Sequence, residues 1–317
     1  MRLCSFRLIG LALAGFAFVG MWGCGSGVRV NTITTTVTPL AGEDLAGPCT
    51  YETPIPYDTA PQIAVLVIFE RGDSGELFDD ASMRAMAYAL HLTTVYAHQC
   101  NAKSFGDLQP DATRGPGRAL FAALTQFAGL TGHAELAKAP VILFGFSAAG
   151  VLSATLTHAY PDRVMGAIPF APGSAFLNLD TVTVSAADAR VPVLVLGNAQ
   201  DQLSGTERGY AYFDRGRAIG ARWGFGVQNQ TPHCCTLSTR SLILPWVEAV
   251  ARGAGSGVPS YFRCVLDGSQ DGQGLVNCRI VDASITTPLG QGEDTGWLPD
   301  DATAQAWLAW VTNPKTN

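Results

Sequence analysis

A single serine stands in a short pattern that could support nucleophilic chemistry. Residues 141–150 read VILFGFSAAG, so Ser147 lies among small residues and between Gly145 and Gly150. A serine hydroxyl becomes an effective nucleophile when a base, usually a histidine, removes its proton. The apolar run before Gly145 is typical of a buried strand, and the residues after the serine are typical of a helix. Strand, tight turn with a central serine, then helix is the order of a nucleophile elbow, and it predicts covalent chemistry at Ser147.

The base is found by elimination among the histidines of the chain. There are five of them: His91, His98, His133, His158 and His233. In elbow proteins the chain order is serine, acid, histidine, and only His158 and His233 follow the serine. His158 lies about three turns along the elbow's own helix and cannot fold back to Ser147. His233 is therefore the predicted base, the alternative being a loop histidine bonded to backbone.

The acid is expected between the serine and the histidine and close to a strand end. Four aspartates lie in turns, connections or a helix: Asp162, Asp180, Asp188 and Asp214. Asp201 alone follows the end of a strand, the apolar run 191–197. An acid there would hold the tautomer of His233 and stabilise its imidazolium form. The alternative is a turn aspartate that caps the next helix.

An oxyanion formed by attack of Ser147 needs two fixed hydrogen-bond donors. One is expected to be the backbone N–H of Ala148, the residue after the nucleophile. The other is expected from the loop after the apolar strand 62–69, where Glu70 and Arg71 are the candidates by position.

The elements that must position these residues alternate between strands and helices. Strands are expected over 62–69, 93–97, 141–144, 164–170, 191–197 and 222–227, and helices over 81–90, 118–130, 151–160 and 206–218. Ser238 is expected to cap a last core helix that contains Pro245. The alternation predicts an α/β fold with a mostly parallel sheet that is covered on both faces. Reactive groups gather at the carboxyl ends of such strands.

Residues 253–317 form an addition after the main domain, which is expected over 48–252. Residues 261–267 and 275–282 indicate a hairpin, and a helix is expected from Asp301. Pairing of the two strands sets Cys264 opposite Cys278, which predicts a disulfide between them. We expect this hairpin and helix to pack on the main domain, the alternative being that its tryptophans touch substrate.

The N-terminal residues have the layout of an export signal over 1–23, because Arg2 and Arg7 precede an almost wholly apolar stretch. That stretch is short for a spanning helix, which needs about 20 residues. Met21-Trp22-Gly23-Cys24 resembles the lipobox of bacterial lipoproteins, so lipidation at Cys24 and simple cleavage both stay open. Eight cysteines fit an exported protein, either a cell-envelope lipoprotein or a secreted one. Residues 24–47 are expected to be a tether, with an edge strand over 28–37 as the alternative.

Charge and composition narrow the partners. The net charge is −6 with scattered lysines and arginines, so no basic stripe indicates nucleic acid. No phosphate-binding loop is visible. A zinc site at His233, Cys234 and Cys235 lacks the paired C-x-x-C spacing, so no metal is expected. A membrane is expected to be a partner only through a lipid on Cys24.

These motifs resemble the α/β-hydrolase superfamily, and more narrowly secreted esterases related to polyhydroxybutyrate depolymerases and feruloyl esterases. The resemblance covers about 49–252 and rests on Gly145-Phe146-Ser147-Ala148-Ala149-Gly150, Tyr160-Pro161-Asp162-Arg163, Gly197 with Asp201, and His233. It implies the α/β-hydrolase fold, Ser147 as nucleophile, Asp201 as acid, His233 as base and no cofactor. The implied substrate is a small or polymeric carboxylic ester. A peptidase or amidase using the same residues, or a non-catalytic surface-binding protein, are the alternatives.

The chain departs from these relatives beside the site. Ala149 replaces the second motif glycine. We expect this replacement to be tolerated, because a methyl group still lets the helix and the strand approach closely. Some feruloyl esterases and tannases bridge a cysteine before the serine to one after the histidine, but here Phe146 precedes the serine. Cys234 must then pair with Cys100 or Cys49, or with its neighbour Cys235.

Overall fold

The computed structural model describes residues 31–54, 60–177, 179, 182–253, 255–268 and 274–312. The expected export signal over 1–23 and Cys24 lie outside these residues. Within the described ranges, no helix combines the length and the apolar character needed to cross a membrane.

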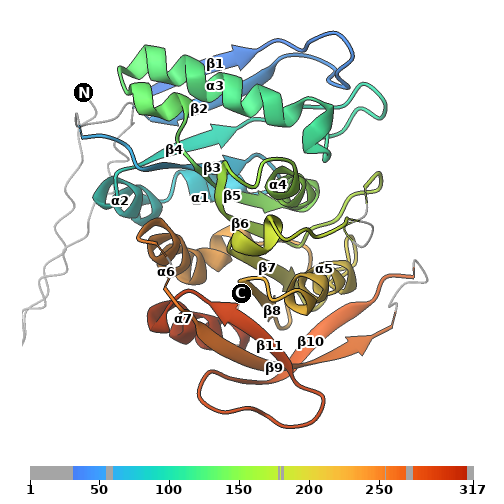
Figure 1. Ribbon diagram of the computed structural model, residues 1–317. Helices are drawn as coiled ribbons and strands as arrows, with labels where there is room; N and C mark the ends of the chain where they lie inside the picture. The colour runs from blue at the N-terminus through green and yellow to red at the C-terminus, as the bar shows by residue number, and fades with distance from the viewer. Residues whose placement is uncertain are drawn as a thin grey trace, which may run out of the picture. The chain divides into compact units, whose positions relative to one another are not determined.

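An eight-stranded sheet runs through the described chain in the order β1-β2-β4-β3-β5-β6-β7-β8 (Figure 1). Its strands are β1 (Thr32–Val37), β2 (Cys49–Pro54), β3 (Ala64–Phe69), β4 (Leu92–Ala97), β5 (Val141–Phe146), β6 (Val164–Phe170), β7 (Val193–Asn198) and β8 (Trp223–Gln228). β2 is antiparallel to β1 and β4, and the strands from β4 to β8 run parallel. The parallel strands bring the carboxyl ends of β5, β7 and β8 to one edge of the sheet.

Helices cover both faces of this sheet (Figure 1). On one face, α3 (Pro116–Thr131) packs on β1 and β2, α4 (Ala148–Ala159) on β5 and β6, and α5 (Glu207–Ala218) on β7 and β8. On the other, α2 (Ala81–Ala89), α6 (Arg240–Ala251) and α7 (Asp301–Thr312) contact β4, β6 and β8. The short α1 (Ser74–Phe78) follows β3. The predicted mostly parallel, doubly covered α/β sheet is therefore confirmed.

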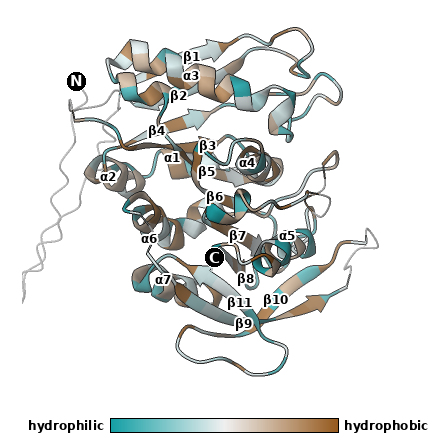
Figure 2. Ribbon diagram, in the orientation of Figure 1, coloured by the Kyte–Doolittle hydropathy of each residue, from teal (hydrophilic) through white to brown (hydrophobic). Residues whose placement is uncertain are grey.

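The composition of each element follows from this burial. β3, β5, β7 and β8 are buried along their whole length, because a parallel sheet covered on both faces has no wet side. In Figure 2 the helix α5 carries much hydrophilic colour, as expected of a helix with one side in solvent.

The C-terminal addition contains a three-stranded antiparallel sheet in the order β10-β9-β11, together with α7. Its strands are β9 (Val258–Asp267), β10 (Asn277–Ser284) and β11 (Asp294–Leu298). The hairpin and the final helix match the sequence prediction, whereas β11 was not predicted. Trp307 and Trp310 are buried, and Trp307 donates its indole N–H to Phe225 O at 2.7 Å. The alternative that these tryptophans touch substrate is therefore wrong, because they pack on β8.

The register of the hairpin differs from the predicted one. Cys264 lies opposite Ile280 and Cys278 lies opposite Leu266, so the two cysteines are diagonal partners. A disulfide joins Cys264 and Cys278 across this diagonal. A β-bulge after Ile280, which sequence periodicity does not reveal, accompanies this register.

Two smaller expectations are corrected at the ends of the main domain. The tether expected over 24–47 does not hold for its described part, where β1 forms the edge strand that was the alternative and Leu45 is fully buried. Ser238 does not cap α6, since the residue before the helix is Thr239 and the Ser238 hydroxyl instead donates to Gln228. Pro245 lies inside α6.

Candidate active site

Ser147 occupies the turn between β5 and α4 in a strained backbone conformation. Its φ is 57° and its ψ is −125°, a region that residues other than glycine rarely adopt. Such strain is kept only where the surroundings fix it, and it clusters at functional sites. The Ser147 N–H donates to Phe170 O at 3.0 Å, and its carbonyl accepts from Gly150 and Gly173. The turn is thus held on both sides, and it carries the serine at the carboxyl end of β5.

The motif glycines are required by the close approach of helix and strand. A Cβ on Gly145 would lie 2.0 Å from Ala149 O, which no side chain could accommodate. A Cβ on Gly150 would lie 3.0 Å from Phe170 O. Ala149 is itself fully buried, so a methyl is accepted at this position as expected.

Asp201 and His233 meet at the neighbouring strand ends, after β7 and β8. His233 Nδ1 lies 2.7 Å from Asp201 Oδ2. The carboxylate is fully buried, and its other oxygen accepts the N–H groups of Leu203 at 2.9 Å and Ser204 at 2.8 Å. These bonds fix the position of the Asp201 carboxylate, which in turn orients the His233 ring through Nδ1. The second ring nitrogen, Nε2, is not used in this contact.

The imidazole packs beside the residue that precedes the serine. The ring centroids of His233 and Phe146 are 4.6 Å apart with 34° between their planes. Among the described residues, the Ser147 hydroxyl has no hydrogen-bond partner, and its residue is half-buried. Catalytic hydrogen bonds often tighten only when substrate binds. The structure therefore leaves both the hydroxyl and His233 Nε2 available to a ligand.

The expected donors at the oxyanion position are partly corrected. Ala148 is the first residue of α4, and its N–H has no intrahelical acceptor. Glu70 and Arg71 are wrong as backbone donors, because their N–H groups already bond Ala97 O at 2.8 Å and Ser74 Oγ at 3.0 Å.

Gly72 is the better candidate for the second donor. It has φ +58°, and a Cβ on it would lie 3.0 Å from Phe146 Cε1, so its backbone lies against the residue before the nucleophile. In the part of the chain that the structure describes, its N–H makes no hydrogen bond. A glycine directly after Glu70 and Arg71 was the available signal in the sequence.

The loop that carries the histidine is tied to the loop after β3. In the described structure Cys234 forms a disulfide with its neighbour Cys235, and Cys49 forms one with Cys100. Of the partners that the sequence left open for Cys234, the structure therefore has Cys235. The Thr236 hydroxyl donates to Asp73 Oδ1 at 2.8 Å, and its N–H lies 3.1 Å from both carboxylate oxygens. Sequence reasoning missed Asp73, since its partner is 163 positions away.

The Cys234–Cys235 disulfide removes two of the three ligands that a zinc site at His233, Cys234 and Cys235 would need. Two cysteines bonded to each other have no thiolates to offer a metal. Over the described ranges, no three His, Cys, Asp or Glu side chains lie close enough together to hold a metal ion.

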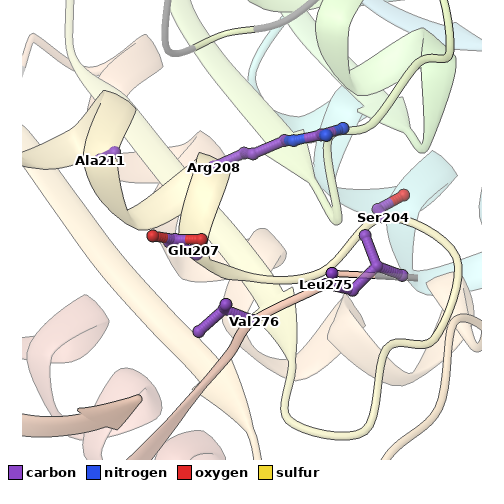
Figure 3. A pocket seen from close by; sticks show the side chains of 7 residues that line it. Ser204, Glu207, Arg208, Ala211, Leu275 and Val276 are labelled. Carbon is purple, nitrogen blue, oxygen red and sulfur yellow. The ribbon is translucent and has the colours of Figure 1, made fainter. Parts of the chain in front are cut away.

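A cavity of about 230 Å³ opens beside the loop between β7 and α5, residues 199–206, which carries Asp201 and is called the acid loop below. It is lined by Ser204, Glu207, Arg208, Ala211, Gly274, Leu275 and Val276, so the loop after β7, the start of α5 and the C-terminal hairpin all contribute (Figure 3). Ser204 packs on Gly173, whose N–H reaches Ser147 O at 3.3 Å.

Apolar side chains, one half-buried and two exposed, lie on three of the loops. Phe105 and Phe176 stack with centroids 3.7 Å apart, and Leu203 is 74% exposed two residues after the acid. A larger cavity of about 490 Å³ lies elsewhere, at the amino ends of β6, β7 and β8 with Val164, Val191 and Arg222 in its lining. It is at the wrong end of the strands to serve Ser147.

The comparisons with known proteins bear on the fold. An acylaminoacyl peptidase from Pyrococcus horikoshii superposes with a TM-score of 0.52 at 11% identity, over 72% of this chain and 43% of that one. The superposition with a thermostable esterase (TM-score 0.47, 13% identity) covers 63% of this chain and 55% of the esterase chain. Brefeldin A esterase, a bacterial homologue of human hormone-sensitive lipase (TM-score 0.47, 16% identity), covers 77% and 81%. The chain thus spans about half the length of the first two. No protein-family model and no curated protein matches the sequence.

Proposed function

We propose that this chain, which has the α/β-hydrolase fold, is a serine hydrolase that cleaves carboxylic esters through an acyl-enzyme. The observation that carries the proposal is the strained Ser147 at the end of β5, whose neighbour Phe146 contacts the His233 imidazole, which is bonded to a buried carboxylate at 2.7 Å. The serine, the base and the acid come from three strand ends on one edge of the sheet, where this fold gathers reactive groups.

The proposed acylation assigns one task to each group. Ser147 Oγ attacks the ester carbonyl while His233 Nε2 takes its proton, and Asp201 stabilises the imidazolium. The tetrahedral oxyanion accepts the N–H groups of Ala148 and Gly72. The intermediate collapses with cleavage of the C–O bond, and the imidazolium gives its proton to the departing alcohol.

Deacylation repeats these roles with water as the nucleophile. His233 takes a proton from water, whose oxygen attacks the acyl carbonyl, and the proton then returns to Ser147 Oγ as the carboxylic acid leaves. The net reaction is ester plus water to alcohol plus acid, so no cofactor is needed.

Ser147→Ala tests the proposal on a short-chain nitrophenyl ester. We expect kcat to fall by a factor of about 10⁴ or more, with the melting temperature within a few degrees of the parent. Undiminished turnover in this variant would overturn the proposal. A nitroanilide with the same acyl group belongs in the same assay, since faster amide cleavage would favour a peptidase or amidase.

The narrower resemblance to polyhydroxybutyrate depolymerases and feruloyl esterases stays a prediction. A panel that runs from acetyl and feruloyl esters to polyesters would assign the acyl and alcohol preferences. The exposed Phe176, stacked on the half-buried Phe105, and the exposed Leu203 support a substrate with apolar surface.

We also propose that the chain is exported, with or without a lipid on Cys24. Three disulfides among the described residues support an oxidising compartment. Metabolic labelling with a fatty-acid analogue, in the parent and in Cys24→Ser, separates the two forms. Label that depends on Cys24 supports the lipoprotein, and unlabelled protein outside the cells supports release.

A further inference from the structure

A side chain from the C-terminal addition reaches the catalytic acid. Asn277, the first residue of β10, donates its amide Nδ2–H to the backbone oxygen of Asp201 at 3.1 Å. The two residues are 76 positions apart, and Asn277 is only 5% exposed. The addition is therefore bonded directly to the residue that orients the proposed base.

The backbone of β10 extends this contact along the acid loop. Val276 O accepts the N–H groups of Thr206 and Glu207, each at 3.1 Å, and Thr206 Oγ1 bonds the Cys278 N–H. A Cβ on Gly205, which has φ +67°, would lie 3.0 Å from Val276 O. The loop after β7 is thus bonded to residues 276–278, and at Gly205 there is no space for a side chain.

The loop after β8, residues 229–235, carries His233 and is called the histidine loop here. It is bonded to the same C-terminal addition. Asn229 directly follows β8, and its Nδ2 lies 3.1 Å from Ile280 O and 3.3 Å from Val311 O. The acid loop and the histidine loop are further joined by the Gln200 N–H, which donates to Thr231 O at 2.9 Å. Strand β10 therefore holds one loop with Asn277 and contacts the other through Ile280.

The disulfide fixes the strand that makes these contacts. Cys278 is fully buried next to Asn277, and its bond to Cys264 ties β10 to β9. Only the Nδ2 group of the Asn277 amide has a hydrogen-bond partner, because the buried Oδ1 has none among the described residues. A buried acceptor without a partner costs folding free energy. What the side chain contributes is its N–H to the acid loop.

We propose that the C-terminal addition positions the acid–base pair and that Asn277 is the positioning residue. The inference rests on the proposed function, since it concerns the geometry of Asp201 relative to His233. A displacement of about 1 Å in a catalytic group can cost a hundredfold in rate. Asn277 acts through the backbone of Asp201 and does not touch substrate.

Asn277→Asp tests this role with almost no change of shape. The carboxylate has no proton to donate at neutral pH, and it faces the Asp201 carbonyl oxygen that accepted the amide. We expect kcat on a nitrophenyl ester to fall about 10- to 100-fold with KM within about threefold. Arg279→Ala is the matched control, because Arg279 lies on the same strand with its side chain exposed and its nearest ion-pair partner is Asp267. The control should keep the parent kcat.

A pH series separates positioning from a structural effect. Burial raises the pKa of the carboxyl introduced by Asn277→Asp, and below that pKa the carboxyl is protonated and can donate again. We therefore expect the ratio of variant to parent kcat to recover as pH falls, at temperatures well below the melting temperature of both proteins. Asn277→Ala, which introduces no group that can be protonated, should show a constant ratio.

The outcomes are distinguishable. If Asn277→Asp and Asn277→Ala keep the parent kcat while Ser147→Ala is inactive, the positioning role is overturned and the proposed function stands. If the parent has no Ser147-dependent turnover, the proposed function itself has failed. A reduced kcat that recovers in acid only for the aspartate variant supports the inference. Should either variant fold poorly, the low-field proton resonance of His233 Nδ1–H reports the pair directly in the folded fraction, and its retention at the parent position would overturn the role.

Discussion

The described chain contains two histidine–aspartate pairs with similar N···O distances in different surroundings. His233 Nδ1 lies 2.7 Å from Asp201, and His158 Nδ1 lies 2.9 Å from Asp188. Both aspartates are almost fully buried. The pairs differ in the second ring nitrogen, because His158 Nε2 is bonded to the Tyr212 hydroxyl at 2.9 Å.

This difference shows that a His–Asp distance alone does not identify a catalytic base. His158 lies in the last turn of α4 and is enclosed by α5 and the residues before β7. Its Nε2 is bonded to Tyr212, and its buried Nδ1 lies beside the Asp188 carboxylate without the geometry of a hydrogen bond. His233 lies beyond a strand end with Phe146 beside it, and its Nε2 has no partner among the described residues. A ring nitrogen without a partner in the described chain, on a ring that contacts the residue before the strained serine, distinguishes the candidate base from the structural histidine.

The largest effect that would sharpen the comparison is expected from the two histidines. His233→Ala should lower kcat by a factor of about 10⁴ or more, because Ser147 loses its base, while the free energy of unfolding changes little. His158→Ala should keep kcat within about twofold but lower the free energy of unfolding by about 1–3 kcal/mol, since Tyr212 loses its partner. Steady-state kinetics and urea unfolding of both variants measure this. The reverse pattern would mean that the pairs have been assigned the wrong roles.

The two aspartates should differ in the same way with a smaller effect on rate. Asp201→Asn places an amide where a carboxylate accepted the Nδ1 proton, so the wrong tautomer is favoured and kcat should fall about 10³- to 10⁴-fold. Asp188→Asn is the matched control, a buried aspartate on the other pair, and it should leave kcat within about twofold. Equal losses of rate in both variants would argue that Asp201 is not the orienting acid.

The smallest effect concerns stability against pH. Burial lowers the pKa of His158, against the opposing influence of Asp188. The unfolded chain takes up this proton near pH 6.5, whereas the folded chain resists it, so the free energy of unfolding should fall as pH drops below about 6.5. His158→Gln should flatten this part of the profile. Urea unfolding at about pH 7.5, 6.5 and 5.5 checks it, and equal slopes for parent and variant would contradict the assignment.

Much of the site could be predicted from local patterns in the sequence. The buried runs of β5, β7 and β8 are continuous and apolar, so their ends, and with them Ser147, Asp201 and His233, could be located by periodicity and chain order. The turn at Ser147 needed only its neighbouring glycines.

The remaining features depend on contacts between distant segments. Glu70 and Arg71 were wrong as donors because the acceptors that occupy their N–H groups belong to β4 and α1. The bonds of Asp73 to Thr236 and of Asn277 to Asp201 join segments 163 and 76 positions apart. The diagonal pairing of Cys264 and Cys278 depends on the hairpin register, which a bulge accompanies. None of these leaves a periodic signal.

The most direct test of the central claim is covalent labelling of the parent protein with a fluorophosphonate, followed by peptide mapping by mass spectrometry. Such probes react with a serine that a neighbouring base activates. We expect one label per chain on the peptide that contains Ser147, and none in Ser147→Ala or His233→Ala. Absence of label on the folded parent protein, or label on another serine, would contradict the claim that Ser147 is an activated nucleophile.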